Sequence, residues 1–278
     1  MPSTHVVVAA LAGLTLIAAV GTSAPARGAE DSRLRAELVE LSHRSVFVGH
    51  QSVGRNLLDG VKELAERAGV PIRIVETASS AGVPPGTFAH GAMPENGNPL
   101  LKLQSFEKAM AAGAADGVDI ALVKFCYVDI EAGTDVPALF AAYQSTLASL
   151  KARYPRTTFV HVTSPLTTVQ GGIKAFVKRL LGRPPAGVAE NARREEFNAL
   201  LRQATRGKEP LFDLALAEST WPDGRAETFE WNGRPVPALV PAYTGDGGHL
   251  DGEGRLRAAR LLISVLASAP SSGAPPKP

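Results

Sequence analysis

Short apolar segments alternate with amphipathic segments along this chain, and this alternation constrains its fold more than any other feature. Five segments have the length and composition of strands, and segments with helical spacing of Leu and Val lie between them. Residues 120–123 are apolar without interruption, which is typical of a strand buried on both faces of a parallel sheet. The predicted strands are residues 45–49, 72–76, 118–123, 157–162 and 211–216.

Repeated strand–helix units predict a parallel sheet with helices on both of its faces. The predicted fold class is α/β, a three-layer α/β/α sandwich with a mostly parallel five-stranded sheet, as in flavodoxin-like proteins. Residues 78–98, rich in Gly and Pro, are predicted to form a long loop, and residues 218–245 an irregular segment with a hairpin around residues 231–234. The predicted helices are residues 31–42, 53–68, 100–112, 136–150, 171–181, 189–205 and 256–266.

The two ends of the chain differ in composition from the rest. Residues 6–20 are apolar or small, and small residues follow as far as Ala29, so residues 1–29 are predicted to be a secretory signal peptide, cleaved after Ala26 or Ala29. The apolar run is shorter than the roughly 20 residues of a membrane span, although an uncleaved anchor is the alternative. Residues 268–278, rich in Pro, Ser and Gly, are predicted to be disordered. One domain, residues 30–267, remains, and the protein is expected in the periplasm or outside the cell.

The charge and cysteine content exclude some classes of function. The formal net charge is +2 over 278 residues, with both signs mixed along the chain, so no strong overall field attracts nucleic acid or anionic lipid. Cys126 is the single cysteine, which excludes an intramolecular disulfide. Once the signal is cleaved, no membrane span is expected. The oligomeric state stays open.

A serine follows the first predicted strand and begins the next helix. At this position Ser52 would be an ordinary helix N-cap, or it would present its hydroxyl beside the free amides of the first helical turn, which suit a developing oxyanion. Gly49 and Gly54 flank it and are expected to let the backbone turn tightly. Ser52 is therefore the candidate nucleophile.

An acid and a base lie just before the last predicted helix. Asp246 precedes His249 by three residues in a Gly-rich loop, where the carboxylate can meet the imidazole Nδ1 and leave Nε2 free to accept a proton from a serine. The alternative is a surface turn in which His249 merely enters the helix. Nucleophile, base and orienting acid are the three roles that acyl transfer needs.

Two sequence blocks make the chain resemble the SGNH (GDSL-type) hydrolases. Residues 49–54 read Gly-His-Gln-Ser-Val-Gly and residues 246–250 read Asp-Gly-Gly-His-Leu. They are similar to the family's nucleophile block after the first strand and its Asp-x-x-His block before the last helix. The resemblance covers residues 45–266. It implies the three-layer fold and a triad of Ser52, His249 and Asp246.

The chain also departs from the family's pattern. Gln51 replaces the acidic residue that usually precedes the serine, and residues 124–129 contain Asp129 but not the family's oxyanion Asn. Another group must therefore hold the oxyanion or line the substrate site. The candidates are the backbone amide of Gly97 or Gly91, the side chains of Asn96, Asn98 and Asn56, and the pocket-lining His50.

Other reactive side chains have plainer interpretations. His43, His90 and His161 lack the spacing of metal ligands, so no metal and no cofactor are expected. Cys126 is a rival nucleophile, although lone cysteines in apolar segments usually serve packing. Trp221 and Trp231 would stack on a sugar or cover the edge of the core.

The sequence thus predicts an exported serine esterase or acyl hydrolase whose substrate is a small-molecule or carbohydrate ester. Two alternatives remain open. The same fold would serve as a non-catalytic polysaccharide-binding or assembly module, or as an O-acyltransferase that passes the acyl group to a sugar hydroxyl.

Overall fold

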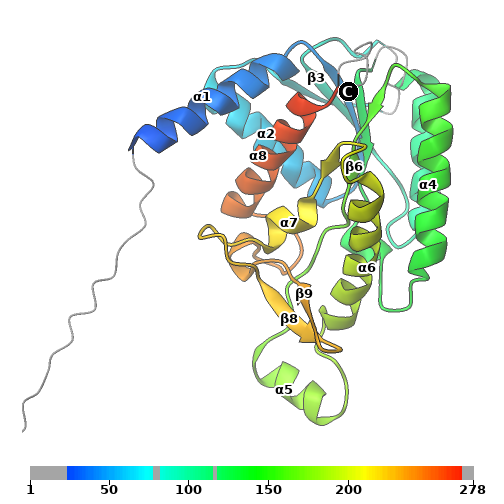
Figure 1. The fold of residues 1–278 in the computed structure, drawn as a ribbon, viewed down its shortest axis with the longest axis vertical. Helices are drawn as coiled ribbons and strands as arrows, with labels where there is room; N and C mark the ends of the chain where they lie inside the picture. The colour runs from blue at the N-terminus through cyan, green and yellow to red at the C-terminus, as the bar shows by residue number, and fades with distance from the viewer. Residues whose placement is uncertain (1–23, 78–81, 115–117, 271–278) are drawn as a thin grey trace, which may run out of the picture.

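A parallel sheet of five strands forms the centre of the protein (Figure 1). The computed structural model describes residues 24–77, 82–114 and 118–270, so most of the predicted signal peptide and most of the C-terminal tail lie outside it. The strand order is β2-β3-β1-β4-β5, and every neighbouring pair is parallel. The predicted α/β fold with a central parallel sheet is confirmed. The strands are β1 (Ser45–His50), β2 (Arg73–Glu76), β3 (Thr87–Ala92), β4 (Ile120–Val123) and β5 (Thr158–Phe159).

Strand β1 lies in the middle of the sheet and is buried on both faces. Successive side chains of a strand point to opposite faces. Val46 and Val48 accordingly belong to one apolar core, and Phe47 belongs to the other. The uninterrupted apolar run of β4 divides in the same way, which explains why it contains no polar residue.

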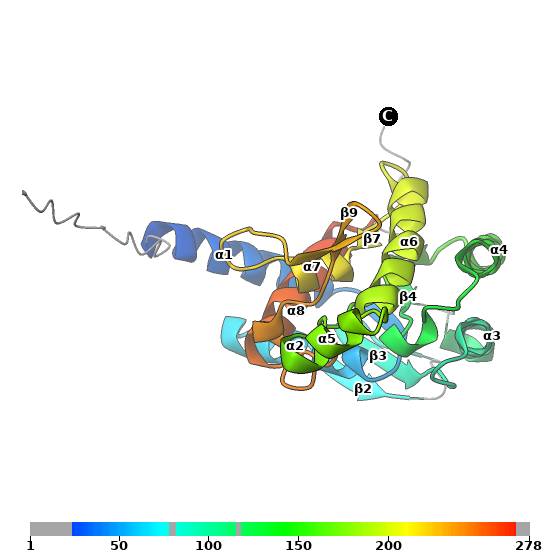
Figure 2. The same ribbon diagram turned by 90° about the horizontal axis from the view of Figure 1, so that it is seen from below.

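Helices cover both faces and complete three layers (Figure 2). Helices α1, α2, α7 and α8 pack on the face of Val46 and Val48, and helices α3, α4 and α6 pack on the face of Phe47. Helix α1 begins within the segment that the sequence assigned to the signal peptide. The helices are α1 (Ala24–Leu41), α2 (Val53–Ala68), α3 (Pro99–Ala109), α4 (Val136–Arg153), α5 (Gly172–Leu180), α6 (Val188–Thr205), α7 (Leu214–Ser219) and α8 (Gly252–Ser268). No helix of the described residues is both long and apolar enough to cross a membrane.

The prediction of a continuous loop over residues 78–98 was wrong, because this stretch contains β3. The strand reads Thr-Phe-Ala-His-Gly-Ala and lacks the β-branched pattern of its neighbours. It lies between β2 and β1 and pairs with both, so pairing and burial hold it extended where its own residues do not favour a strand.

The last two predicted strands are shorter than expected. Residues 157–162 divide into β5 and β6 (His161–Val162), and β6 pairs with β7 (Leu211–Phe212) in a separate two-stranded sheet. The predicted strand 211–216 ends at β7 because Asp213 caps α7, where its carboxylate accepts from the Leu216 amide at 3.2 Å. The predicted hairpin is confirmed as β8 (Thr228–Trp231) and β9 (Arg234–Pro237).

The strand order reverses its direction between β1 and β4, which makes the carboxyl ends of these two strands the switch point of the sheet. The chain moves from β1 toward β2 and β3 on one side, then crosses to β4 on the other side of β1. Ligands of open α/β sheets bind where the direction reverses in this way. Ser52, which follows β1, and residues 124–129, which follow β4, both lie at this edge.

Glu218 on α7 is fully buried, and this makes the stability depend on pH. Its Oε2 accepts from the Leu166 amide at 2.6 Å, while Oε1 has no hydrogen-bond partner within the described residues. Burial raises the pKa of Glu218 from 4.5 to about 8, against the opposing effects of the Leu166 amide, Lys124 and Arg194. The native protein therefore holds a proton that the unfolded chain releases between these values.

The free energy of unfolding should fall as the pH rises from about 5 to about 8, by up to about 1.4 kcal/mol per pH unit from this group. Glu218→Gln keeps the acceptor for Leu166 and removes the ionisation, so it should flatten this dependence in urea unfolding. The exposed Glu230→Gln is the matched control. An unchanged pH slope in the Glu218 variant would contradict the assignment.

Candidate active site

Ser52 occupies a strained backbone conformation between β1 and α2. Its φ is 34° and its ψ is −94°, a left-handed value that side chains rarely adopt. The other non-glycine residue of the described chain with positive φ is Asn232, in the β8–β9 turn. The Ser52 side chain makes no capping hydrogen bond to the helix, so the plain N-cap interpretation is wrong. A sharp strand-to-helix turn of this kind exposes the hydroxyl of a nucleophilic serine.

The two glycines beside Ser52 serve close packing rather than the turn. Neither has a positive φ. A Cβ at Gly49 would lie 2.8 Å from the Phe106 ring, and a Cβ at Gly54 would lie 2.3 Å from Cβ of His50. The expectation that these glycines form the turn was therefore wrong, and Ser52 itself adopts the unusual conformation.

Asp246 and His249 form a hydrogen-bonded pair in the loop before α8. Nδ1 of His249 lies 2.6 Å from Oδ2 of Asp246, and Oδ1 accepts from the amides of Gly248 at 2.9 Å and His249 at 2.8 Å. Hydrogen bonds from the His249 amide, the His249 ring and the Gly248 amide lower the pKa of Asp246 far below its usual range. The carboxylate thus stays ionised and accepts the proton on Nδ1, which leaves the lone pair of a neutral imidazole on Nε2. Nε2 has no hydrogen-bond partner in the described part of the chain.

Cys126 and Tyr127 connect the serine to the histidine. Sγ of Cys126 lies 3.7 Å from Oγ of Ser52, and the ring of Tyr127 meets the ring of His249 edge-on at 5.7 Å between centroids. A Cβ at Gly248 would lie 2.8 Å from the Tyr127 ring, so a larger residue at this position would require the ring to move. Segments almost 200 positions apart in the sequence thus contact two consecutive residues at the end of β4. Among the described residues no hydrogen bond joins Ser52 directly to His249.

A buried ion pair anchors the loop between β3 and α3. Nζ of Lys102 lies 2.6 Å from Oδ2 of Asp129, and both side chains are inaccessible to solvent. The same carboxylate accepts from the amides of Cys126 at 2.6 Å and Gly97 at 2.8 Å. Lys102 also donates to Oδ1 of Asn96 at 2.8 Å. Asp129 therefore ties the segment after β4 to the loop between β3 and α3.

These bonds decide which predicted oxyanion donors are available. The Gly97 amide is occupied by Asp129 and is not free to donate in this conformation. Asn98 caps α3 by accepting from the Leu101 amide at 3.0 Å through Oδ1, so its oxygen is occupied by the helix. Asn96 is exposed, its Oδ1 is held by Lys102, and its Nδ2 has no partner within the residues described. Asn56 is half-buried on α2 with an unpaired Oδ1. The Ser52 amide donates to no backbone carbonyl of the described chain.

The structure explains why glutamine is acceptable before the serine. Nε2 of Gln51 donates to the Met93 carbonyl at 2.9 Å, and the Met93 amide donates to the His50 carbonyl at 2.9 Å. An ionised acidic side chain cannot donate to a carbonyl. Gln51 therefore fastens the loop that carries Asn96 to the end of β1.

His50 is a buried residue that packs against the Ser52 turn, and it does not line an open pocket as the sequence predicted. It is buried, packs against Gly54, and its Nε2 lies 3.1 Å from Nδ1 of His90. Nη1 of Arg55 lies 3.3 Å from Nε2 of His90, so His90 is expected to carry its proton on Nδ1 and donate it to His50. Burial, followed by the charges of His90, Lys124 and Arg55, lowers the pKa of His50 to about 3. A histidine with so low a pKa holds an added proton weakly and is therefore unsuited to be the catalytic base.

The sequence analysis missed the buried lysine at the end of β4. Lys124 is inaccessible, donates to the Phe125 carbonyl at 2.8 Å and lies 3.9 Å from Sγ of Cys126. Burial lowers its pKa, and the neighbouring Cys126, Glu218 and Asp129 oppose this. A charged residue that directly follows an uninterrupted apolar strand was the available signal, because lysine is rarely buried without a specific reason.

The remaining candidates take structural roles. His161 is buried, with Nδ1 2.8 Å from the Tyr143 hydroxyl and Nε2 paired with Glu209. Trp221 packs against the core and donates to Glu227 at 2.8 Å. The described ranges hold no cluster of three or more His, Cys, Asp or Glu side chains that could ligate a metal.

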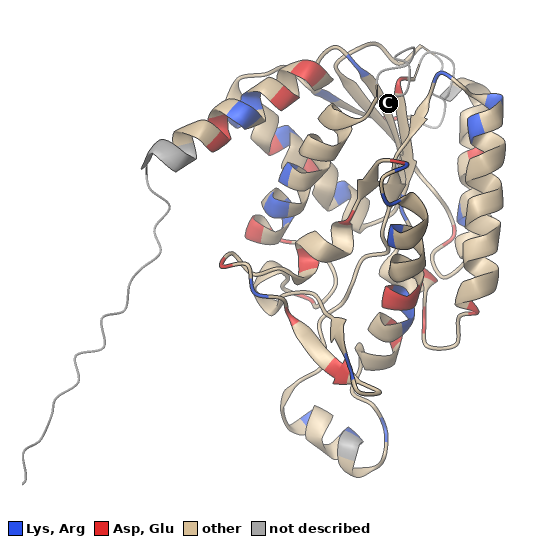
Figure 3. Cartoon of the chain, in the orientation of Figure 1, with Lys and Arg blue, Asp and Glu red and all other residues tan. Residues whose placement is uncertain are grey.

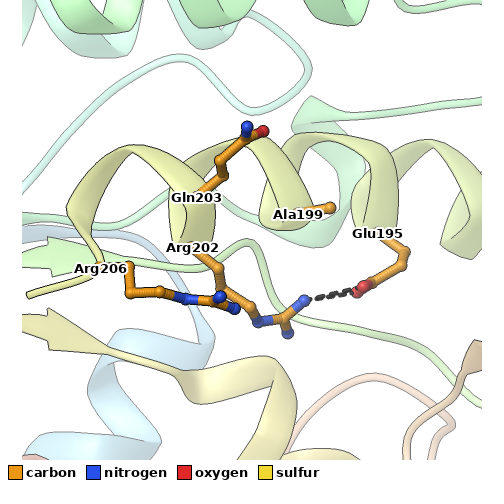
Figure 4. Close-up of a pocket in the computed structure, with 5 residues that line it drawn as sticks. All are labelled: Glu195, Ala199, Arg202, Gln203 and Arg206. Carbon is orange, nitrogen blue, oxygen red and sulfur yellow. Dashed lines mark hydrogen bonds and ion pairs between the residues drawn. The ribbon is translucent and has the colours of Figure 1, made fainter.

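Two pockets lie outside the candidate triad, since neither is lined by Ser52, His249 or Asp246. Figure 4 shows one on α6, of about 450 Å³, in which Arg202 contacts Glu195. Arg202 also binds Asp213 at 2.6 Å, so its guanidinium is already paired with two carboxylates. A second pocket, of about 360 Å³, lies between the Gly97–Leu100 loop and α4, beside the loop that carries Asn96.

Of the comparisons with known proteins, only the one with solved structures finds similar proteins. No protein-family model and no curated protein matches the sequence. Among solved structures, a protein from Streptococcus pneumonia provisionally described as a platelet activating factor has a TM-score of 0.50 at 15% identity, covering 86% of this chain and 93% of that one.

Two further structures are similar at lower scores. The lipase/acylhydrolase from Enterococcus faecalis has a TM-score of 0.47 at 13% identity over 81% of this chain and 95% of that one. The periplasmic domain of the lipopolysaccharide acetyltransferase from Salmonella ser. Paratyphi A has a TM-score of 0.41 at 14% identity over 80% and 82%. At such identities the likeness to these proteins concerns the fold alone.

Removing the cation of the buried pair should destabilise the protein strongly. Lys102→Met leaves Asp129 as an uncompensated buried charge, so the free energy of unfolding should fall by about 3 kcal/mol or more in urea unfolding. The double variant Lys102→Met/Asp129→Asn should recover part of this loss. Lys108→Met, exposed on the same helix, is the control. Equal stability of the Lys102 and Lys108 variants would show that the pair is not an anchor.

Proposed function

We propose that this protein is a serine-dependent acyl ester hydrolase with a triad of Ser52, His249 and Asp246. One observation carries the proposal. An imidazole oriented by a carboxylate at 2.6 Å and a serine hydroxyl on a strained strand-to-helix turn contact consecutive residues at one edge of the sheet. The fold alone would not support a reaction, because such folds host many activities.

Each side chain has a defined part in the proposed reaction. Ser52 attacks the carbonyl carbon of the ester, and Nε2 of His249 accepts the hydroxyl proton. The ionised Asp246 stabilises the resulting imidazolium. His249 then gives the proton to the leaving alkoxide as the C–O bond breaks, and a water molecule releases the acyl group from Ser52 by the same steps in reverse.

Two groups are suited to hold the oxyanion. The Ser52 amide lies at the positive end of α2 and has no backbone acceptor among the described residues. The Asn96 amide is oriented by Lys102 through its oxygen, which leaves its N–H groups to donate. Asn96 would thus take the place of the family's missing Asn, at which position this chain carries Val128.

The hydroxyl must turn from Cys126 toward His249 before attack. Rotation about a side-chain bond of a partly exposed serine is rapid, and catalytic hydrogen bonds are often absent or long without substrate. The apolar segment at residues 6–20 supports export as part of this proposal, and a carbohydrate ester remains the finer hypothesis for the substrate.

Ser52→Ala should abolish hydrolysis of p-nitrophenyl acetate, because it removes the nucleophile while leaving the core intact. The wild type should be labelled by a fluorophosphonate probe, and Ser52→Ala should not. Ser268→Ala, a serine outside the site, should behave as the wild type in both assays. Turnover by Ser52→Ala at the wild-type rate would reject the role of Ser52.

Asp246→Asn should keep the fold and lower kcat by several orders of magnitude, since an amide favours the wrong tautomer of His249. The measurement is kcat at a pH where the wild type is fully active, together with an unfolding curve to show that the variant is folded. A loss of less than tenfold would argue that Asp246 does not orient the base.

A non-catalytic binding module is the second candidate. It is favoured by the hydrogen bond of Ser52 to Cys126 and by the absence of Asn at position 128. Failure of folded wild-type protein to react with the fluorophosphonate probe would select it. If the probe labels Ser52 but esters are hydrolysed slowly, the rate should be measured again with a sugar as acyl acceptor, which would identify an acyltransferase.

A further inference from the structure

Helix α5 lies in a segment, residues 170–186, that projects from one end of the molecule (Figure 1). This segment is called the excursion below. The excursion closes at its neck, where the Gln170 amide donates to the Ala186 carbonyl at 2.9 Å. The Thr168 amide, just before the neck, donates to the Gly247 carbonyl at 2.9 Å in the loop of Asp246 and His249. The excursion is therefore attached directly to the candidate active site.

One face of α5 is apolar and faces solvent. Ile173 is 83% exposed, Phe176 66%, Val177 44% and Leu180 76%. These positions follow the i, i+3, i+4, i+7 spacing of a single helical stripe. Leu181, which follows the helix, is 67% exposed. Five of the nine large exposed apolar side chains of the described chain thus lie in nine consecutive residues, a concentration that marks an interaction surface.

The same segment is basic. Residues 171–187 contain Lys174, Lys178, Arg179 and Arg183 and no Asp or Glu, although the whole chain has a net charge of only +2. Figure 3 shows both signs of charge on the large helices but no acidic residue on α5. A helix with an apolar stripe and basic flanks is the type that lies in the interface of an anionic membrane.

We propose that α5 docks on the surface of an anionic lipid bilayer. The apolar stripe of Ile173, Phe176, Val177 and Leu180 enters the boundary between headgroups and acyl chains. Lys174 directly follows Ile173 and lies beside the stripe, so its long side chain reaches the phosphates of the headgroups, and Lys178 adds positive charge to the same helix. The helix lies on the membrane and does not cross it.

Docking of α5 would bring the candidate active site close to lipid. The Thr168 amide donates to the Gly247 carbonyl, so the base of the α5 excursion is bonded to the Asp246–His249 loop. This consequence rests on the proposed function, whereas binding itself does not. A vesicle-binding measurement therefore separates failure of the docking proposal from failure of the proposed function.

The first test reads the position of α5 locally, in the full chain. Phe176→Trp is mixed with phosphatidylglycerol vesicles whose acyl chains carry bromine, which quenches tryptophan within the bilayer. We expect quenching of Phe176→Trp beyond that of the unsubstituted protein, and none beyond it for Leu216→Trp, an exposed position on α7. Equal quenching of both variants would overturn the proposal, because attachment through another segment would not place residue 176 in the lipid.

The second test measures affinity by sedimentation with vesicles. Ile173→Ser/Phe176→Ser/Leu180→Ser should bind phosphatidylglycerol vesicles at least about tenfold more weakly, and Lys174→Gln/Lys178→Gln about tenfold or more at low salt. The exposed Lys208→Gln is the control for charge. Wild-type binding by both α5 variants would overturn the proposal. So would a wild-type dimer in analytical ultracentrifugation that the triple variant converts to a monomer, since the stripe would then contact a second copy.

Discussion

The carboxylate of Asp129 is the group on which the candidate active edge depends. It accepts from the Cys126 amide after β4, from the Gly97 amide in the loop between β3 and α3, and from the Lys102 ammonium on α3. Three separate segments are thus held by one buried charge. A buried ion pair contributes little net stability by itself, but it strongly penalises any arrangement that breaks it. Its value here is that it fixes the position of Asn96 and Cys126 relative to the sheet.

Strain is concentrated where the chemistry is proposed. Ser52 takes a backbone conformation that costs of order 1–3 kcal/mol, and the surrounding packing must therefore over-determine it. Gly54 against His50 and Gly49 against Phe106 supply that packing, since neither contact leaves room for a Cβ. These two close contacts keep the turn rigid. A nucleophile needs such rigidity if its hydroxyl is to meet a base at the right distance.

Elements with a local, periodic sequence signal could be predicted from the sequence. Features that are held in place by residues distant in the chain could not. The central strands, most helices and the Asp246–His249 loop were visible because apolar periodicity and a short motif are local signals. Strand β3 was not visible, because it is held by β1 and β2 rather than by its own residues. The occupied amide of Gly97 and the buried Lys102 were equally inaccessible, since both follow from Asp129 about thirty positions away.

Of the buried ionisable groups near Ser52, some are paired with an opposite charge and others are not. Asp129 is neutralised by Lys102, whereas Lys124 lies among Glu218, Cys126 and backbone carbonyls without an ion pair in the described chain. The pKa of Lys124 is lowered and that of Glu218 is raised, so both groups are biased toward their neutral forms. The charged form of Lys124 is the protonated, positive one. Its Nζ lies 3.9 Å from Sγ of Cys126, which in turn contacts Oγ of Ser52. When Lys124 carries its proton, its positive charge favours negative charge near Ser52, which is the sign that a developing oxyanion requires.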